Sequence, residues 1–191
     1  GKVSLESIPF DYYQQMQSIY HTLKFKSDEK NVDLIMNIDS GVPQFLIGDP
    51  VRVGQIVTNL LSNAIKFTDK GTITFGYKMI RNLENTNTEK VRFYVKDSGI
   101  GISPQNHKHI FERFTREKND VSNEYGGLGL GLSIAKENVG LLGGELTLES
   151  EKGKGSTFYV NLPYKPTINK SELEEEINKI VISDLKNPTI L

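Results

Sequence analysis

Hydrophobic residues recur along this chain at two spacings, one typical of helices and the other of strands. The three- to four-residue spacing of a helix with one buried side appears after Asp11, after Pro50 and over residues 130–142. Asp49 and Pro50 supply the N-cap and the first position of the second helix. In the first helix the predicted buried side consists of Tyr13, Met16, Ile19, Tyr20 and Leu23.

Strands are predicted where β-branched and aromatic residues cluster or alternate with polar residues. These segments are residues 3–10, 32–38, 72–80, 91–96, 145–150 and 156–162. They do not alternate with the helices as repeated βαβ units. The order of elements therefore favours an α+β sandwich over a doubly wound parallel sheet.

Two regions lack such a pattern. Residues 99–129 contain no regular pattern longer than a turn or two, and a loop of that length inside a compact domain is usually functional or disordered. After Pro163 the composition becomes that of a linker, and a capping-box pattern at Ser171 opens a short helix. We therefore expect one domain over residues 1–164 and a separate tail over residues 165–191.

Composition narrows the class of protein. A length of 191 residues allows one domain of ordinary size with an appendage. The net charge of −1 gives no sequence-independent attraction to nucleic acid. No apolar run approaches the ~20 residues that span a bilayer, and the first residues lack the apolar core of a secretion signal. The absence of cysteine agrees with a reducing compartment, so we expect this domain in the cytoplasm.

The helix after Pro50 carries two amides beside its apolar side. Asn59 and Asn63 lie one turn apart, and Lys66 continues the same stripe in an i, i+4, i+7 pattern. A buried amide without a partner costs free energy, so something polar should lie against this pair. On this segment alone, an ordinary solvated helix surface is the alternative.

A carboxylate and two glycines follow the strand at residues 91–96, in the run Asp97-Ser-Gly99-Ile-Gly101. A carboxylate at the end of a strand can accept a hydrogen bond from an exocyclic amine such as that of adenine. Glycines let the backbone pass close to a flat ring. The alternative is a plain Asp-Ser-Gly turn.

Glycines also precede the helix at residues 130–142, in the run Gly126-Gly-Leu-Gly129-Leu-Gly131. Exposed backbone N–H groups and the helix dipole favour an anion there by about 0.3–1 kcal/mol, so the run can cradle phosphate. It is neither a Walker A loop nor a dinucleotide fingerprint, because no Gly-Lys-Ser/Thr follows it and no strand immediately precedes it. A flexible hinge is the alternative, and a hinge and a cradle can coexist in a lid.

Two aromatic and two basic residues lie between these runs, namely Phe111, Arg113, Phe114 and Arg116. The aromatic rings could anchor a mobile lid on the domain, and the guanidinium groups are suited to phosphate. A short amphipathic turn with solvated arginines is the alternative for this segment taken alone.

In this order and spacing the four motifs resemble the ATP-binding catalytic domain of sensor histidine kinases. That family belongs to a superfamily with gyrase, a heat-shock chaperone and mismatch-repair ATPases. The resemblance covers residues 3–163. It implies a two-layer α/β sandwich in which three helices cover one face of a mixed, mostly antiparallel sheet, with a long ATP lid at about residues 99–129.

The resemblance also implies a site for ATP and Mg²⁺. Asn63 would coordinate the metal ion through its amide oxygen, Asn59 would support that site, and Lys66 would face the phosphates. Arg116 would lie near the γ-phosphate. The implied adenine side consists of Asp97, Gly99, Gly101, Ile102 and Thr157, with the Thr157 hydroxyl in a water network. The implied triphosphate cradle consists of Gly127, Leu128, Gly129, Leu130, Gly131 and Leu132.

Asn59 distinguishes branches of this superfamily. ATP-hydrolysing relatives typically have glutamate at this position as the general base, and an amide cannot take a proton near neutral pH. The implied activity is therefore transfer of the γ-phosphate to a histidine of a partner domain. A degenerate nucleotide-binding module that only docks to a partner and a plain ATPase of the chaperone type are the alternatives. A serine-directed relative, such as an anti-sigma-factor kinase, fits less well.

The phosphoacceptor of such a kinase is not found in this sequence. None of His21, His107 and His109 lies in the His-Glu/Asp-x-x-Thr-Pro context of the family's phosphorylated helix. We therefore expect a dimerisation and phosphoacceptor domain upstream of Gly1, and a response regulator receiver domain after the linker that ends at Leu191. The parent would be a homodimer, with an anchor in the inner membrane as one arrangement, and the fragment a monomer.

Overall fold

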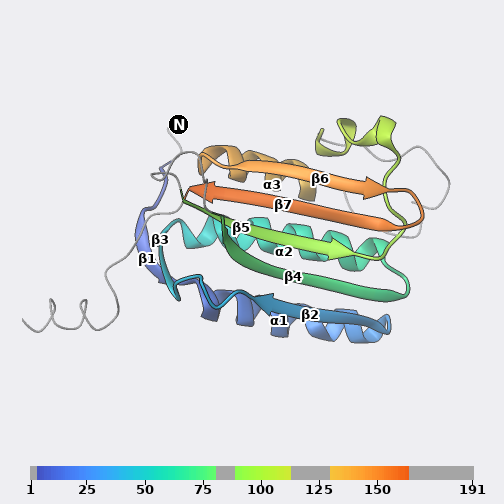
Figure 1. Cartoon of the computed structure of the whole chain (residues 1–191), viewed down its shortest axis with the longest axis horizontal. Coiled ribbons are helices and arrows are strands. Elements are labelled where there is room, and N and C mark those ends of the chain that lie inside the picture. Colours follow the sequence, from blue (N-terminus) through green and yellow to red (C-terminus); the bar gives the residue numbers. More distant parts are fainter. Residues whose placement is uncertain (1–3, 81–88, 113–129, 164–191) are drawn as a thin grey trace, which may run out of the picture.

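The computed structural model describes residues 4–80, 89–112 and 130–163, and these form two layers, with three helices behind one sheet (Figure 1). The helices are α1 (Tyr12–Glu29), α2 (Pro50–Phe67) and α3 (Gly131–Leu141). The main sheet has the order β2 (Val32–Ile38), β4 (Gly71–Ile80), β5 (Lys90–Asp97), β7 (Gly155–Pro163) and β6 (Glu145–Glu151). The β2–β4 pair is parallel and the other three pairs are antiparallel. The predicted α+β sandwich with a mixed, mostly antiparallel sheet is confirmed.

A second, two-stranded sheet pairs β1 (Ile8–Asp11) with β3 (Phe45–Gly48) in antiparallel register. The strand expected over residues 3–10 is wrong in its extent, because residues 4–7 are not in a strand. The reason is the partner: β3 offers only four residues, so β1 forms only where Ile8 meets Gly48 and Asp11 meets Phe45. The sequence pattern did not indicate β3 at all.

Side-chain caps start both long helices as expected. Asp11 accepts a hydrogen bond from the backbone N–H of Gln14 at 2.8 Å, and Asp49 accepts one from Arg52 at 3.1 Å. Pro50 occupies the first turn of α2, where its missing N–H leaves no bond unmade. The capping residues therefore fix where α1 and α2 begin.

The buried side of α1 differs from the prediction at its first turn. Tyr12 is 2% exposed, whereas Tyr13 is 40% exposed. Tyr12 is drawn inward because its ring meets the edge of Tyr77 at 4.4 Å between centroids, and its N–H donates to the Gln44 carbonyl. Met16 and Leu23 are buried as expected.

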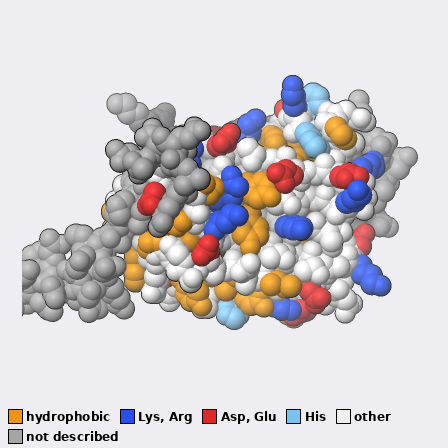
Figure 2. All heavy atoms as spheres, viewed as in Figure 1, with side chains coloured by type: hydrophobic (Ala, Val, Ile, Leu, Met, Phe, Trp, Pro, Cys, Tyr) orange, Lys and Arg blue, Asp and Glu red, His pale blue; other side chains and the backbone are white. Residues whose placement is uncertain are grey.

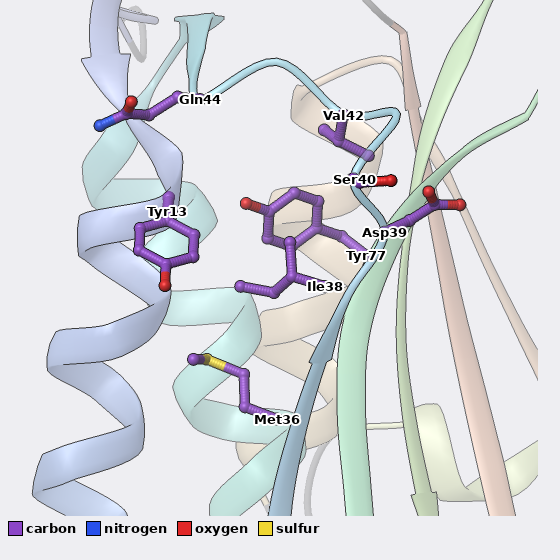
Figure 3. Close-up of a pocket in the computed structure, with 8 residues that line it drawn as sticks. All are labelled: Tyr13, Met36, Ile38, Asp39, Ser40, Val42, Gln44 and Tyr77. Carbon is purple, nitrogen blue, oxygen red and sulfur yellow. The ribbon is translucent and has the colours of Figure 1, made fainter.

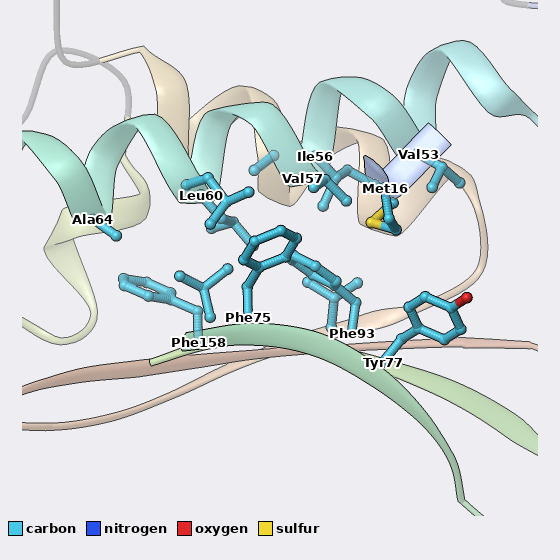
Figure 4. Close-up of a cluster of buried hydrophobic side chains, with 14 of the residues drawn as sticks. Met16, Val53, Ile56, Val57, Leu60, Ala64, Phe75, Tyr77, Phe93 and Phe158 are labelled. Atoms are coloured by element: carbon cyan, nitrogen blue, oxygen red, sulfur yellow. The ribbon is translucent and has the colours of Figure 1, made fainter. Parts of the chain in front are cut away.

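The core lies between α2 and the central strands (Figure 4). Leu60 and Phe75 are fully buried and face each other across the two layers. Side chains alternate between the two faces of each strand, so every second residue of β4, β5 and β7 enters this core. The other residues form the open face of the sheet, where basic, acidic and apolar side chains are mixed (Figure 2).

Two short 3₁₀ turns, Pro104–Asn106 and His109–Phe111, follow β5 in the segment expected to form the lid. The Phe111 ring meets the Phe158 ring edge-on, with 6.2 Å between centroids. One of the two proposed aromatic anchors therefore lies against the domain, while Phe114 lies outside the described residues. No helix in the described part of the chain is long and apolar enough to cross a membrane.

We predict that Phe75→Ala lowers the free energy of unfolding by about 3–5 kcal/mol, because a fully buried ring is replaced by a cavity against α2. Equilibrium unfolding in urea measures the change. Ile35→Ala on the open face is the control, since Ile35 is 48% exposed and its removal should cost less than about 1 kcal/mol. Equal losses in the two variants would contradict this placement of the core.

Candidate functional site

The C-terminal ends of α2 and β5 meet at one place. The backbone N–H of Ile100 donates to the carbonyl of Phe67 at 3.2 Å, which satisfies a carbonyl at the end of the helix. Ser98 donates to the Thr72 carbonyl at 3.1 Å, and its hydroxyl accepts from the Thr72 N–H at 2.9 Å. The segment after β5 is therefore tied both to α2 and to the start of β4.

Lys30, the residue directly after α1, contacts the same end of α2. The ammonium group of Lys30 donates to the carbonyls of Ile65 at 2.7 Å and Lys66 at 3.2 Å, and lies 3.3 Å from the Asp69 carboxylate. A cation at a helix C-terminus is favoured by the helix dipole as well as by the hydrogen bonds. Lys30 thus helps to fix the turn that carries Lys66.

Asp97 is the last residue of β5 and is 7% exposed. Its Oδ1 accepts from the N–H groups of Gly99 at 2.9 Å and Ser156 at 3.3 Å, whereas Oδ2 meets no donor among the described residues. Burial raises the pKa of the Asp97 carboxyl, and the two backbone donors offset only part of that effect. The carboxylate therefore presents one fixed oxygen to the protein and one free acceptor to a ligand.

The two glycines after Asp97 are needed for different close approaches. A Cβ placed on Gly99 would lie 2.3 Å from the Phe67 carbonyl oxygen, so only glycine fits against the end of α2. Gly101 has φ +65°, and its Cβ would lie 2.0 Å from the Glu151 carbonyl oxygen. The close contact of Gly101 is thus with the turn between β6 and β7, whereas the sequence had suggested a contact with a ligand ring.

Ile102 continues from this turn as a half-buried side chain packed against the core. Its N–H donates to the Ser150 hydroxyl at 2.8 Å, and its carbonyl lies 3.1 Å from Nε2 of His107. The start of the predicted lid is therefore anchored on β6 as well as on α2.

The register of β5 and β7 shows that the predicted site residue Thr157 is not on the same face of the sheet as Asp97. Asp97 is paired with Ser156 and Lys96 with Thr157, and residues paired across two strands share a face of the sheet. Thr157 therefore lies on the open face with Lys96, on the side of the sheet opposite to the Asp97 carboxylate, and its place in an adenine network stays a prediction from the family resemblance. Ser156, which we missed, is buried there and lies 2.8 Å from the Ser150 hydroxyl. Counting back by two from the core residue Phe158 would have found it.

Asn59, Asn63 and Lys66 are half-buried along one stripe of α2, as the sequence predicted. Neither amide is hydrogen-bonded to another described residue. The Lys66 ammonium lies 5.2 Å from the centre of the Phe67 ring. This stripe is therefore polar, partly enclosed and available to a ligand.

Helix α3 runs antiparallel to α2, which brings its N-terminal end toward the turns of α2 that carry the two asparagines (Figure 1). Near the other end, Asn138 of α3 bonds to both Arg52 and Gln55 of α2, at 3.0 and 2.9 Å. Among the described residues, none lies within 4 Å of a Cβ built on Gly131, the first residue of α3, and none caps this helix N-terminus with its side chain. The first N–H groups of the helix, which have no partner within the helix itself, therefore lie toward the asparagine stripe.

Only some of the remaining residues of the predicted phosphate cradle belong to the described part of the chain. Leu130 precedes α3, and its carbonyl accepts from the Ser133 hydroxyl at 2.9 Å, while Leu132 packs against the core. Four residues lie outside the described part of the chain: Arg116, Gly127, Leu128 and Gly129. Their assignment rests on the sequence alone.

A sequence-family model described as "Histidine kinase-, DNA gyrase B-, and HSP90-like ATPase" matches residues 48–166, from the start of α2 past the end of β7. This chain belongs to that family. The match includes the asparagine stripe, the Asp97 turn and the glycine run before α3.

Individual relatives narrow the comparison to histidine kinases. The signal transduction histidine-protein kinase BarA of Escherichia coli (strain K12) is 39% identical over 170 residues, which cover 88% of this chain and 18% of BarA. Hybrid signal transduction histidine kinase F of Dictyostelium discoideum is 38% identical over 166 residues, covering 86% of this chain and 15% of that protein. The chain therefore spans only a small part of these curated relatives.

Solved structures show the same fold. Full-length ShkA in complex with AMPPNP superposes with a TM-score of 0.75 at 26% identity, over 87% of this chain and 33% of that one. The nucleotide-free catalytic domain of the histidine kinase ThkA has a TM-score of 0.67 at 27% identity, over 84% of this chain and 99% of that domain. The chain is thus homologous to the ATP-binding catalytic domains of sensor histidine kinases.

The contrast between two glycines of the site gives a stability test. We predict that Gly99→Ala lowers the free energy of unfolding by about 2–4 kcal/mol, because its Cβ would collide with the Phe67 carbonyl. Gly131→Ala is the control: its Cβ meets open space at the start of α3, so stability should be unchanged or raised by up to about 1 kcal/mol. Thermal unfolding compares the two, and a Gly99→Ala domain as stable as the parent would refute the close contact.

Proposed function

We propose that this domain binds Mg²⁺-ATP and transfers the γ-phosphate to a histidine of a dimerisation and phosphoacceptor domain in two-component signal transduction. The single observation that carries the proposal is the Asp97 carboxylate, in which Oδ1 is held by two backbone N–H groups and Oδ2 has no donor among the described residues. The Asp97 carboxylate is a hydrogen-bond acceptor in a fixed position, next to Gly99, where only glycine fits. Such an acceptor suits the exocyclic amine of adenine. The family to which the chain belongs supports the same assignment.

The asparagine stripe fits the phosphate end of this nucleotide. The Asn63 amide oxygen is a hard donor of the kind that Mg²⁺ accepts, and Mg²⁺ usually takes its other ligands from phosphates and water. Among the described residues no group of three His, Cys, Asp or Glu could hold a metal ion. When bound, Mg²⁺ would neutralise phosphate charge. In this proposal Asn59 supports the metal site at Asn63, and Lys66 places a positive charge near the phosphates.

The uncapped N-terminus of α3 supplies further N–H donors for phosphate. In the proposed complex Leu130, Gly131 and Leu132 form the described part of the cradle. Gly127, Leu128 and Gly129 complete it, and Arg116 approaches the γ-phosphate, as the family resemblance implies.

The absence of a carboxylate from α2 favours transfer over hydrolysis. Helix α2 contains no Asp or Glu, and the position of the superfamily's general base is Asn59. An amide cannot accept a proton from water near neutral pH. Attack by water on the γ-phosphate is therefore not assisted by a general base. The imidazole of an acceptor histidine is a stronger nucleophile than water and can take the γ-phosphate without one.

The proposed partners follow from the histidine kinase assignment. Of the chain's own histidines, His21 is exposed on α1, and His107 and His109 lie in or beside the short turns after β5. We infer that the acceptor histidine belongs to another domain of the same protein. Because several relatives are named hybrid kinases, a receiver domain fused to this chain is part of the proposal, as is a cytoplasmic site of action.

Asp97→Asn separates binding from folding. We predict that it lowers ATP affinity at least about tenfold, because the free acceptor becomes an amide that cannot be oriented for both the backbone donors and the base. Its melting temperature should be unchanged or higher, since a buried charge is removed. Calorimetric titration with Mg-ATP measures the affinity. Asp33→Asn, exposed on β2, is the matched control and should bind normally.

Transfer itself is tested with radiolabelled ATP and the dimerisation and acceptor domain of the parent protein. We predict an acid-labile phosphoryl group on that domain, and at least about a tenfold slower transfer by Asn63→Ala, because the phosphates lose a ligand of their metal ion. Asn37→Ala, exposed on β2, should transfer normally. ATP binding without transfer would favour a docking module, and rapid phosphate release without acceptor would favour an ATPase.

A further inference from the structure

A cavity lies at the end of the sheet away from Asp97, between the start of α1 and the loop that follows β2 (Figure 3). Its volume is about 510 Å³, within the roughly 300–1,000 Å³ that is usual for small-molecule sites. Tyr77, which lines it, lies four residues beyond Ile73, the partner of Asp97 on β4. Four residues of strand span about 13 Å, so the cavity is separate from the proposed nucleotide site.

Aromatic and aliphatic side chains form the walls of this cavity. Tyr13 of α1 lies across from Tyr77 of β4, and both rings border the same space (Figure 3). Three aliphatic side chains beside them are half-buried and packed against the core, namely Met36, Ile38 and Val42. Walls of this kind suit a flat aromatic ring.

One polar group inside the cavity is buried and has no partner. Tyr77 is 1% exposed, and its hydroxyl points into the space beside Tyr13 (Figure 3). No described residue forms a hydrogen bond with this hydroxyl, and its oxygen is accessible from the cavity. By contrast, the Tyr13 hydroxyl accepts from Nε2 of Gln17, and the Gln44 amide donates to Asp11, each at 2.7 Å. The Tyr77 hydroxyl is therefore the buried polar group that is available to a ligand.

The charges around the cavity favour a cationic ligand over an anionic one. The described residues that line it include Asp39 and no Lys, Arg or His. Burial, and to a smaller degree the nearby carboxylate of Asp11, raises the pKa of the Tyr77 hydroxyl. The hydroxyl therefore stays protonated at neutral pH and can accept a hydrogen bond from a charged amine. The faces of aromatic rings also attract cations.

We propose that this cavity is a binding site for a small aromatic amine. The ring of the ligand lies between Tyr13 and the aliphatic side chains of β2, and its ammonium group donates to the Tyr77 hydroxyl. This inference does not depend on the proposed ATP-binding function, because no residue of the Asp97 site takes part in it.

The test is a titration of the ¹⁵N-labelled chain with phenethylamine, followed by amide chemical shifts. We expect shifts at Tyr13, Ile38 and Val42 and a dissociation constant of about 1–10 mM, in keeping with the small size of the probe. Phenylacetate carries a similar ring and the opposite charge, and should bind at least about tenfold more weakly. Saturating Mg-ATP should leave the affinity for phenethylamine unchanged, since the two sites are separate.

Tyr77→Phe removes only the hydroxyl. It should bind phenethylamine about three- to tenfold more weakly than the parent. Its melting temperature should be equal or higher, because the hydroxyl has no bond to a described residue. Tyr94→Phe is the matched control: Tyr94 pairs with Gly76 and lies on the other face of the sheet, so this variant should bind like the parent.

Four results would overturn the inference. They are the absence of shifts around the cavity, equal binding by Tyr77→Phe and the parent, equal affinities for phenethylamine and phenylacetate, and competition by Mg-ATP, which would place the probe in the nucleotide site. A chain that binds phenethylamine as expected but binds no ATP would leave this inference standing while the proposed function fails.

Discussion

The packing of α2 on the central strands is the constraint on which the rest of this structure depends. One side of the helix is buried against the sheet, with Leu60 fully enclosed opposite Phe75. That contact fixes the rotation of the helix about its axis, so the stripe with Asn59 and Asn63 has to lie at the edge of the core. It also fixes the axial position of α2, and therefore places Phe67 and Thr68 against the turn that follows β5. The position of the polar stripe on α2 therefore follows from the packing of the apolar side of the same helix on the sheet.

Several contacts build the Asp97 end of the candidate site into the fold. Strand pairing on both sides positions Asp97, and the N–H groups of Gly99 and Ser156 orient its carboxylate. Lys30 and Ile100 close the end of α2 around the same point. Apart from the Gly99 hydrogen bond, which spans two residues, these contacts join segments far apart in the sequence, so folding itself sets the geometry of the Asp97 carboxylate.

The parts of the site that follow from local rules could be predicted from the sequence. The cap at Asp49, the asparagine stripe and the Asp97 turn depend on residues within one or two turns of each other. The predictions were wrong where a residue distant in the sequence determines the burial of a side chain or the length of a strand. Tyr12 is buried because of Tyr77, and β1 is short because β3 is short. The pocket in Figure 3 lies between α1 and the end of β2, where Tyr13 and Tyr77 approach each other, and no local pattern indicated it. The strand register, which the sequence alone did not give, pairs Ser156 with Asp97 and leaves Thr157 on the other face of the sheet.

At the candidate site, the groups that the fold leaves incomplete gather along one stripe and around one turn. Burial raises the pKa of the Asp97 carboxyl, and the described residues offer no hydrogen-bond partner to the Thr68 hydroxyl or to the amides of Asn59 and Asn63, which is unfavourable in an empty domain. Such local conflicts are expected where a ligand completes the structure. In the proposed complex, the adenine amine would meet the Asp97 carboxylate and the metal ion would meet the Asn63 amide. Helix α2 contains no carboxylate that could activate water, which supports the proposal of phosphate transfer over hydrolysis.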